Sequence, residues 1–258
     1  MLKVPVFYYH SIGNVGPETL AAERFRQHLC LLKDAGYTTL TASELIHLDK
    51  HDCSQYVALT FDDGLLDNYE IAVPILEQFG FKATFFVIPG FDNLTRWVNP
   101  KTRQWSDVSK QGFTIPFPSM QQHHRRELSD MGMEIGSHSM THPKLNKIPV
   151  SRLQNEILES RHRLEDQLGK PVTSFCYPKG RYNTEVLHHI KSAGYECAFT
   201  TMPSYYEATT PRYECGRFLI ESPALFERVL RWSSAKHLGV QSLCQVINPV
   251  LKLKNYYT

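Results

Sequence analysis

The chain has 258 residues, of which 42% are hydrophobic and 21% charged, a balance typical of folded globular proteins rather than disordered or fibrous ones. Its formal net charge is +2 with Lys and Arg spread along the chain, so nothing indicates a nucleic-acid-binding surface. The six cysteines include no CxxC pair and are expected to be free thiols. No apolar run reaches the roughly 18 residues that a membrane-spanning helix needs.

The first ten residues carry no signal for export. They are apolar and aromatic but contain Lys3 and Pro5, and they lack the long apolar stretch and the small-residue cleavage site of a signal peptide. This pattern favours a cytoplasmic protein, although an exported protein whose leader had been removed would look the same.

Strand-like and helix-like segments alternate along most of the chain. Short apolar, β-branched runs predict buried strands, and apolar residues three and four apart predict helices between them. Repeated units of this kind predict a largely parallel sheet or barrel with helices outside. The predicted strands are residues 4–9, 37–40, 56–61, 82–88, 133–136, 172–177 and 197–200, and the predicted helices are residues 18–35, 42–48, 69–79, 153–168, 184–193 and 224–232.

One stretch interrupts this alternation. Residues 90–119 contain several prolines and no clear period, which predicts a long loop over one face of the fold. Trp97 and Trp105 in this loop could stack on a bound ligand, but we favour packing of the loop onto the barrel. Because no internal repeat or linker is present, we interpret residues 1–258 as a single domain.

Two carboxylates directly follow the predicted strand 56–61. Asp62 and Asp63 precede Gly64 at the carboxyl end of this strand, where α/β folds place their reactive groups. Taken alone, an Asp-Asp-Gly sequence is as typical of a turn or a helix N-cap. The carboxylates therefore need a second observation before they indicate a site.

Two histidines supply that observation. His138 and His142 follow the predicted strand 133–136, and their spacing lets two imidazoles grip one ion from a helical turn or a tight loop. Alone, they could be two unrelated histidines. Together with Asp63 they form the two-imidazole, one-carboxylate set of a catalytic zinc site, which leaves a position open for water. Asp62 would then accept the proton of that water.

These motifs resemble those of the polysaccharide deacetylase (NodB-homology) family, carbohydrate esterase family 4, and most closely its poly-N-acetylglucosamine deacetylase branch. The resemblance implies an α/β fold, a distorted (β/α) barrel, and hydrolysis of acetamides on sugars such as N-acetylglucosamine. It also implies one divalent metal, usually zinc, with cobalt or nickel as substitutes. The matching segments are residues 8–11, 60–64, 82–87, 138–142 and 174–180, within a resemblance that covers residues 4–220.

The resemblance also implies roles for individual positions. Asp62 resembles the family's catalytic base. A backbone N–H near Lys179 would help to hold the oxyanion, and Tyr177 lies in the same motif at the substrate. The positions that match the family's metal ligands are Asp63, His138 and His142.

One departure from the family pattern concerns the group that orients the base. Many members carry an arginine two residues before the proline of the third motif, but this chain has Cys176 there. We interpret Cys176 as a small, inert residue buried in a strand. Another side chain must then orient Asp62, and Arg217 is the candidate.

The general acid is the second departure. Many relatives supply a histidine from a late motif, but that place reads Glu221 here, and no histidine occurs between His189 and His237. In the branch resembling the poly-N-acetylglucosamine deacetylases, the acid instead follows the first strand, where His10 matches it. A core histidine bonded to the backbone is the alternative for His10; we favour catalysis, with Glu221 as the rival acid.

The sequence therefore predicts an intracellular zinc-dependent deacetylase that acts on an N-acetylated sugar, oligosaccharide or lipid-linked glycan. The lack of a signal peptide argues against cell-wall polymers as substrates. The alternatives are a deacylase of a non-sugar amide and a catalytically inactive sugar-binding protein of the same fold. Competent residues at every proposed reactive position argue against the inactive protein. The sequence defines neither the sugar and its length nor the oligomeric state.

Overall fold

The structure, a computed structural model, describes residues 3–13, 19–49, 55–92, 119–220 and 223–233, and the backbone of 96–98 and 105–107. Its centre is an eight-stranded sheet in the order β11-β10-β9-β6-β5-β1-β12, with β4 also paired to β5. Its strands are β1 (Val6–Tyr9), β4 (Thr38–Leu40), β5 (Tyr56–Phe61), β6 (Thr84–Val87), β9 (Glu134–Ser137), β10 (Ser174–Cys176), β11 (Cys197–Phe199) and β12 (Phe218–Leu219).

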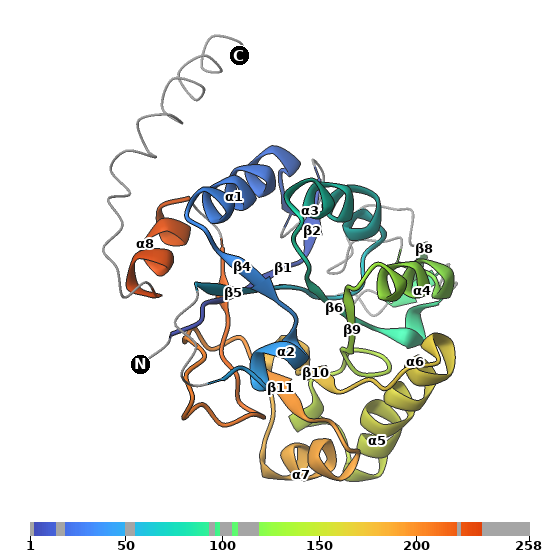
Figure 1. Cartoon of the computed structure of the whole chain (residues 1–258). Helices are drawn as coiled ribbons and strands as arrows, with labels where there is room; N and C mark the ends of the chain where they lie inside the picture. Colours follow the sequence, from blue (N-terminus) through green and yellow to red (C-terminus); the bar gives the residue numbers. More distant parts are fainter. Residues whose placement is uncertain are drawn as a thin grey trace.

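The strand pairs of this sheet run parallel, and the sheet curls into a half-barrel with helices around its outside (Figure 1). β5 is the centre of the arrangement: β1 pairs with it on one side, and on the other side β4 pairs with its first half and β6 with its second half. This architecture confirms the predicted α/β fold of the distorted (β/α)-barrel type.

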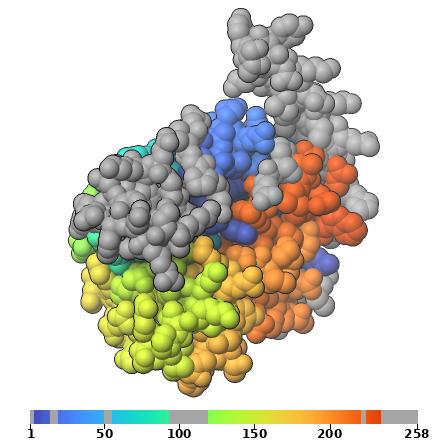
Figure 2. All heavy atoms as spheres, turned by 180° about the vertical axis from the view of Figure 1, so that it is seen from behind, coloured from blue at the N-terminus to red at the C-terminus, as the bar shows by residue number. Residues whose placement is uncertain are grey.

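Most helices surround the sheet, whereas α2 lies inside their ring, across one end of the sheet (Figure 1). The segments containing α4 to α6 and α7 lie side by side in the view from behind (Figure 2), where α5 contacts α7. The helices are α1 (Ala22–Asp34), α2 (Ala42–Ile46), α3 (Val73–Phe79), α4 (Gln122–Asp130), α5 (Val150–Gln154), α6 (Ser160–Leu168), α7 (Thr184–Ser192) and α8 (Pro223–Ser233).

Short turns and two small sheets complete the described fold. Two π-helical turns stand out because each interrupts a predicted continuous helix: η1 (Asn68–Ala72) precedes α3, and η4 (Asn155–Glu159) separates α5 from α6. The remaining elements are η2 (Pro89–Phe91), η3 (Leu145–Lys147) and η5 (Pro178–Gly180), the parallel pair β2 (Ser11–Ile12) and β3 (Thr19–Leu20), and the antiparallel pair β7 (Arg96–Val98) and β8 (Trp105–Asp107).

The predicted loop 90–119 contains structure that its sequence did not suggest. It holds the β7–β8 pair, and the side chains of Trp97 and Trp105 lie outside the described residues. The helix α4 and the strand β12 were not predicted either. Among the described helices, none is long and apolar enough to cross a membrane.

Aromatic rings fill the core on the α1 side of β5. Phe61 stacks on Phe85 with centroids 4.8 Å apart and on Tyr9 at 5.4 Å, and all three side chains are buried. Burial of large apolar side chains is the main source of stability in such a core. These packed rings therefore stabilise the strands that carry the candidate site residues at their ends.

A buried histidine lies within this core. His28 of α1 is 2% exposed, its ring stacks on Phe226 at 4.3 Å between centroids, and its Nδ1 lies 3.4 Å from the Tyr9 hydroxyl. Burial, with a smaller contribution from Arg24, lowers the pKa of His28 from 6.5 to about 4. The folded protein therefore keeps this ring neutral at pH values where the unfolded chain protonates it.

We predict that stability falls as the pH decreases from 6.5 towards about 4, because the unfolded state binds the proton that folded His28 excludes. This group alone should lower the free energy of unfolding by about 2 kcal/mol between pH 7 and pH 5. His28→Phe keeps a stacked ring and should remove that part of the pH dependence. Urea denaturation at both pH values measures it, with the exposed His162→Gln as control; an unchanged pH dependence in His28→Phe would contradict the prediction.

Candidate active site

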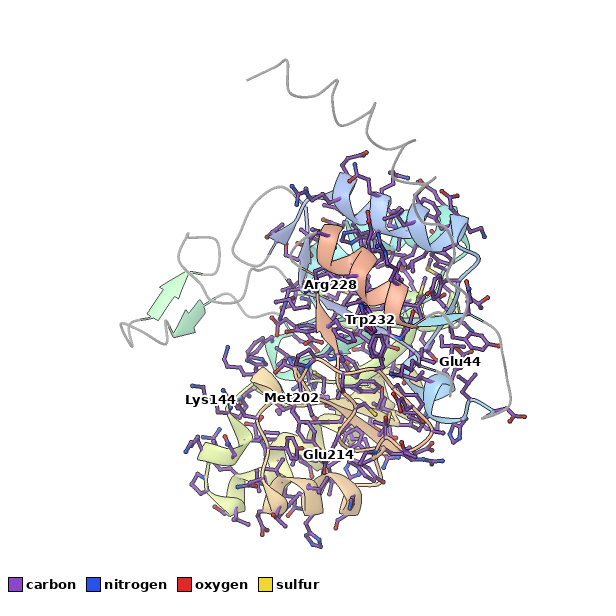
Figure 3. The ribbon with its side chains drawn as sticks, turned by 90° about the vertical axis from the view of Figure 1, so that its left-hand side faces the viewer. Glu44, Lys144, Met202, Glu214, Arg228 and Trp232 are labelled. Carbon is purple, nitrogen blue, oxygen red and sulfur yellow. The ribbon has the colours of Figure 1, made fainter. Side chains whose placement is uncertain are left out.

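The candidate site lies where parallel strands end. Asp62 and Asp63 directly follow β5, and His138 directly follows β9. Because the strands of the sheet are parallel, their carboxyl ends meet at one edge. Lys144, just beyond the histidine loop, lies on the side from which β7 and β8 extend, whereas Glu44 of α2 lies at the opposite side (Figure 3). The site and α2 therefore occupy opposite ends of the fold.

Three predicted ligands converge on one point. Asp63 Oδ1 lies 3.6 Å from Nε2 of His138 and 3.6 Å from Nε2 of His142, and all the potential ligand atoms lie within 4.8 Å of one another. The Asp63 Oδ1 atom is buried and has no hydrogen-bond partner within the described part of the chain. A buried oxygen of this kind needs a compensating partner, and a divalent cation bound by all three side chains would provide it.

A backbone hydrogen bond fixes the tautomer of His138. Its Nδ1 donates to the Cys176 carbonyl over 2.8 Å, which leaves the Nε2 lone pair directed at Asp63. Metal-binding histidines commonly donate their second ring N–H in this way. Burial lowers the pKa of His138 and lowers that of His142 further, so both imidazoles are neutral, as ligation requires.

Backbone strain is concentrated at the same residues. Asp63 has φ 71°, Ser139 has φ 64° and His142 has φ 57°, all in the left-handed region that non-glycine residues rarely adopt. Such conformations persist where the surroundings over-determine them, and they cluster at functional sites. At Gly64 (φ 67°) a Cβ would lie 2.9 Å from Val87, so the turn after the carboxylates requires glycine.

Asp62 forms a buried ion pair with Arg217. Arg217 donates from Nη1 to Oδ1 over 2.7 Å and from Nη2 to Oδ2 over 2.8 Å, and both side chains are almost fully buried. Burial by itself raises the pKa of Asp62, but the Arg217 guanidinium outweighs it and holds this pKa well below its ordinary value. Asp62 is therefore a fixed, permanently ionised carboxylate, and the candidate Arg217 contacts it.

The small side chain of Cys176 lies against this arginine. It lies at the end of β10, is fully buried, and its Sγ is 3.0 Å from Arg217 Nη2 and 3.7 Å from Asp62 Oδ2. Burial raises the pKa of the thiol well above its ordinary value. Cys176 is therefore the small buried residue that the sequence predicts, beside the guanidinium that orients Asp62.

A second group of potential ligands shares one histidine with the first. Asp62, His138 and Cys176 also lie within 4.8 Å of one another. However, the guanidinium of Arg217 occupies both carboxylate oxygens of Asp62 and contacts the thiol. A cation there would face a fixed positive charge, so the Asp63 group is the better metal site.

His10 lies close to both carboxylates. Burial raises the pKa of Asp63 overall, and a charge on His10 opposes that rise and contributes to the lowered pKa of Asp62, which places its ring within electrostatic reach of the site. Its ring is 5.8 Å from that of Tyr8 in an edge-on arrangement. The rival, Glu221, lies outside the described residues.

Lys179 and Tyr177 differ in how they relate to the site. Burial raises the pKa of Asp63 and lowers that of His142, and the charge of Lys179 makes a smaller contribution at both, so this residue lies nearby; its backbone has φ 56°. Tyr177 is buried, and its hydroxyl donates to the Tyr213 carbonyl over 3.1 Å. The contacts described for Tyr177 are structural, and its role towards the substrate stays a prediction.

The histidine loop is held by a buried glutamate that the sequence interpretation missed. Glu156, in η4, accepts from the Thr141 backbone N–H over 2.8 Å and from the Thr141 hydroxyl over 2.6 Å, and its carbonyl accepts from Met140 over 3.0 Å. Glu156 is fully buried. The sequence feature that could have revealed Glu156 is the position of a charged residue beside Leu153 and Ile157, on the apolar face of a predicted helix.

Both ends of the segment between β6 and α4 are attached to the site loops. Gly90 donates to the Met140 carbonyl over 3.0 Å, and Met120 donates to the Gly64 carbonyl over 2.8 Å. A Cβ at Gly90 would lie 2.1 Å from the Met140 carbonyl oxygen, so this contact depends on glycine. The segment that contains β7 and β8 thus leaves and re-enters the fold directly beside the candidate site.

Known proteins resemble this chain in sequence. A sequence profile of the polysaccharide deacetylase family matches residues 31–198. YxkH of Bacillus subtilis (strain 168), named for the polysaccharide deacetylases, is 31% identical over 78% of this chain and 65% of its own length. A poly-beta-1,6-N-acetyl-D-glucosamine N-deacetylase of Staphylococcus aureus is 23% identical over 88% of this chain and 76% of its own.

A solved structure agrees with the sequence comparisons. The deacetylase PplD of Streptococcus pyogenes, in complex with acetate, superposes with a TM-score of 0.73 and 26% identity, over 89% of this chain and 97% of its own. The chain spans less than two thirds of the length of YxkH. The sequence match and the common half-barrel show that the chain belongs to the polysaccharide deacetylase family.

Proposed function

We propose that this protein hydrolyses the acetamide of an N-acetylglucosamine-containing glycan and releases acetate and a free amine. The observation that carries the proposal is the buried Asp63, His138 and His142 ligand set beside a carboxylate, Asp62, held ionised by Arg217. A polarising ion next to a fixed base is what hydrolysis of an unreactive amide requires. Membership of the polysaccharide deacetylases supports the acetylated sugar as substrate.

One divalent ion, zinc by preference, would be held by Asp63, His138 and His142. When bound, such an ion polarises the acetyl carbonyl and lowers the pKa of water. The two nitrogen donors and one oxygen donor of these side chains form the ligand set of catalytic zinc sites. Cobalt or nickel would be accepted as substitutes.

Asp62 acts as the general base in this proposal. The bidentate contact with Arg217 fixes its orientation and keeps it unprotonated, so it accepts a proton from the attacking water. As the new carbon–oxygen bond forms, the carbonyl oxygen gains negative charge. The backbone N–H near Lys179 and the nearby ammonium of that residue stabilise this oxyanion.

His10 acts as the general acid. When the carbon–nitrogen bond breaks, its electron pair moves to nitrogen, and the imidazolium of His10 supplies the proton that makes the amine a viable leaving group. The ring then returns to its neutral form. An imidazole suits this step because its ordinary pKa lies near neutrality.

The names of the relatives support an N-acetylglucosamine polymer as one substrate class. The Staphylococcus aureus relative is named for poly-beta-1,6-N-acetyl-D-glucosamine and the Listeria monocytogenes relative for peptidoglycan N-acetylglucosamine. A small or lipid-linked N-acetylated sugar is the other class. The chemistry of the site is common to both, because it acts on the acetamide.

The proposal is tested by acetate release from a panel of N-acetylglucosamine oligomers, nucleotide sugars and lipid-linked sugars. We expect acetate and free amine in equal amounts from at least one class, and loss of release after chelation with recovery on adding zinc. A metal-loaded protein that releases no acetate from any of them would instead support a sugar-binding protein.

We predict that Asp63→Ala and Asp62→Asn separate metal binding from turnover. Asp63→Ala removes a ligand and should lose bound metal and activity together. Asp62→Asn removes the base and weakens its ion pair with Arg217 but removes no ligand, so the folded variant should keep the metal and lose turnover. Metal content after dialysis, measured beside acetate release, distinguishes the two, and equal metal loss in both variants would show that these roles are wrongly divided.

We also predict that His10→Ala binds metal normally but lowers kcat by a factor on the order of 10²–10⁴, the usual contribution of a positioned acid. Glu221→Gln is the matched variant for the rival acid and should retain near-normal turnover. The two variants are compared in kcat and in zinc affinity. Normal turnover in His10→Ala together with loss in Glu221→Gln would transfer the role to Glu221.

A further inference from the structure

We infer that Asn68 is a positioning residue that holds His10 in place for proton donation, an inference that rests on the proposed function. Asn68 is the first residue of the π-helical turn η1, five residues beyond Asp63 in the sequence, and its side chain is fully buried. It contacts the backbone of His10 rather than the ligands or the base. It therefore acts on the reaction through His10.

Asn68 fixes the chain at the point where β1 ends. Its Nδ2 donates to the His10 carbonyl over 2.7 Å and to Asp67 Oδ1 over 2.9 Å. The other oxygen of Asp67 accepts from the Ser11 hydroxyl, and this carboxylate also accepts from the backbone N–H of Ile12. Two consecutive residues, Asp67 and Asn68, thus hold three consecutive residues of the segment that follows β1.

The same segment is attached to the base on its other side. The Asp62 backbone N–H donates to the Tyr9 carbonyl over 2.9 Å. His10 therefore lies between one anchor on the Asp62 loop and another on η1. With both of its neighbouring peptide groups tied, the direction in which the His10 side chain leaves the backbone is determined.

One polar atom of the Asn68 side chain has no hydrogen-bond partner among the described residues. Both of its amide hydrogens are used, but its Oδ1 is buried without a hydrogen-bond partner among the described residues. An orphaned buried carbonyl is unfavourable by roughly 1–3 kcal/mol. A residue kept at such a disadvantage is better explained by what it positions than by its contribution to stability.

The second π-helical turn offers a comparison. Glu156 of η4 holds the loop between His138 and His142 through Met140 and Thr141, in the way that Asn68 of η1 holds the segment with His10. π-helical turns inside helices occur frequently at functional sites. Substitutions of the two residues should have different effects: loss of the Glu156 side chain should weaken zinc binding, whereas loss of the Asn68 side chain should leave zinc binding unchanged.

The test is a double-mutant cycle between Asn68 and His10. Asn68→Ala should lower kcat for acetamide hydrolysis by up to about 10²-fold, the cost of a small misplacement, with little change in KM or zinc affinity. In the His10→Ala background the same substitution should lower kcat no further, because the group it positions is gone. Asn68→Leu keeps the approximate size and removes the donors without adding a charge beside Asp67, so it should behave like Asn68→Ala.

A second substrate reports on the role of the proton. The para-nitrophenolate released from para-nitrophenyl acetate is stable as an anion and needs no acid, so Asn68→Ala and His10→Ala should both spare hydrolysis of this ester relative to the acetamide. Thr41→Ala is the control for lost buried hydrogen bonds, because Thr41 caps α2 at the far end of the fold. It should lower thermal stability without changing the ratio of the two activities.

Several outcomes would overturn the inference. They are near-normal acetamide turnover in Asn68→Ala, equal loss of ester and acetamide hydrolysis, or independent, multiplicative effects of Asn68→Ala and His10→Ala. Reduced zinc affinity in Asn68→Ala would likewise assign the residue to the metal site. A wild-type protein that releases no acetate from any substrate would refute the proposed function itself, which keeps the two failures distinct.

Discussion

The buried ion pair between Asp62 and Arg217 is the interaction around which the site is arranged. Removing one partner of such a pair is strongly destabilising because the other charge is left unpaired. The guanidinium also donates to the Thr200 carbonyl and the Thr60 hydroxyl, and it lies 4.5 Å from the centroid of the Tyr8 ring. Arg217, which directly precedes the edge strand β12, therefore links the end of β5 to Thr200, which directly follows the other edge strand, β11.

In the proposed mechanism, metal ligation and base activation are divided between two neighbouring carboxylates by their surroundings. Asp62 receives two guanidinium N–H groups, whereas Asp63, one residue later with left-handed backbone, turns towards two neutral imidazoles. Burial raises the pKa of Asp63, so in the absence of a cation the ionised form of Asp63 is less stable than that of Asp62. Asp62 is stabilised by the fixed positive charge of Arg217, whereas Asp63 would be stabilised by a cation that binds beside it.

The ends of parallel strands could be predicted from sequence, and with them the meeting of Asp63, His138 and His142. The residues that hold these loops could not, because Asn68 and Glu156 act through contacts between segments far apart in the chain. Helix α4 escaped prediction because its sequence is mostly polar. One of its two buried residues is an arginine, Arg125, which donates hydrogen bonds to Gln167 and to the Met120 carbonyl. At two residues, β12 is too short for any periodicity to reveal it.

The proposed mechanism requires zinc to bind to Asp63, His138 and His142 rather than to the overlapping group of Asp62, His138 and Cys176. X-ray absorption at the zinc edge of the zinc-loaded protein separates these sites most directly, because only the second contains sulfur. The site described here predicts nitrogen and oxygen ligands at about 2.0–2.2 Å and no sulfur. A zinc–sulfur distance of about 2.3 Å would contradict it.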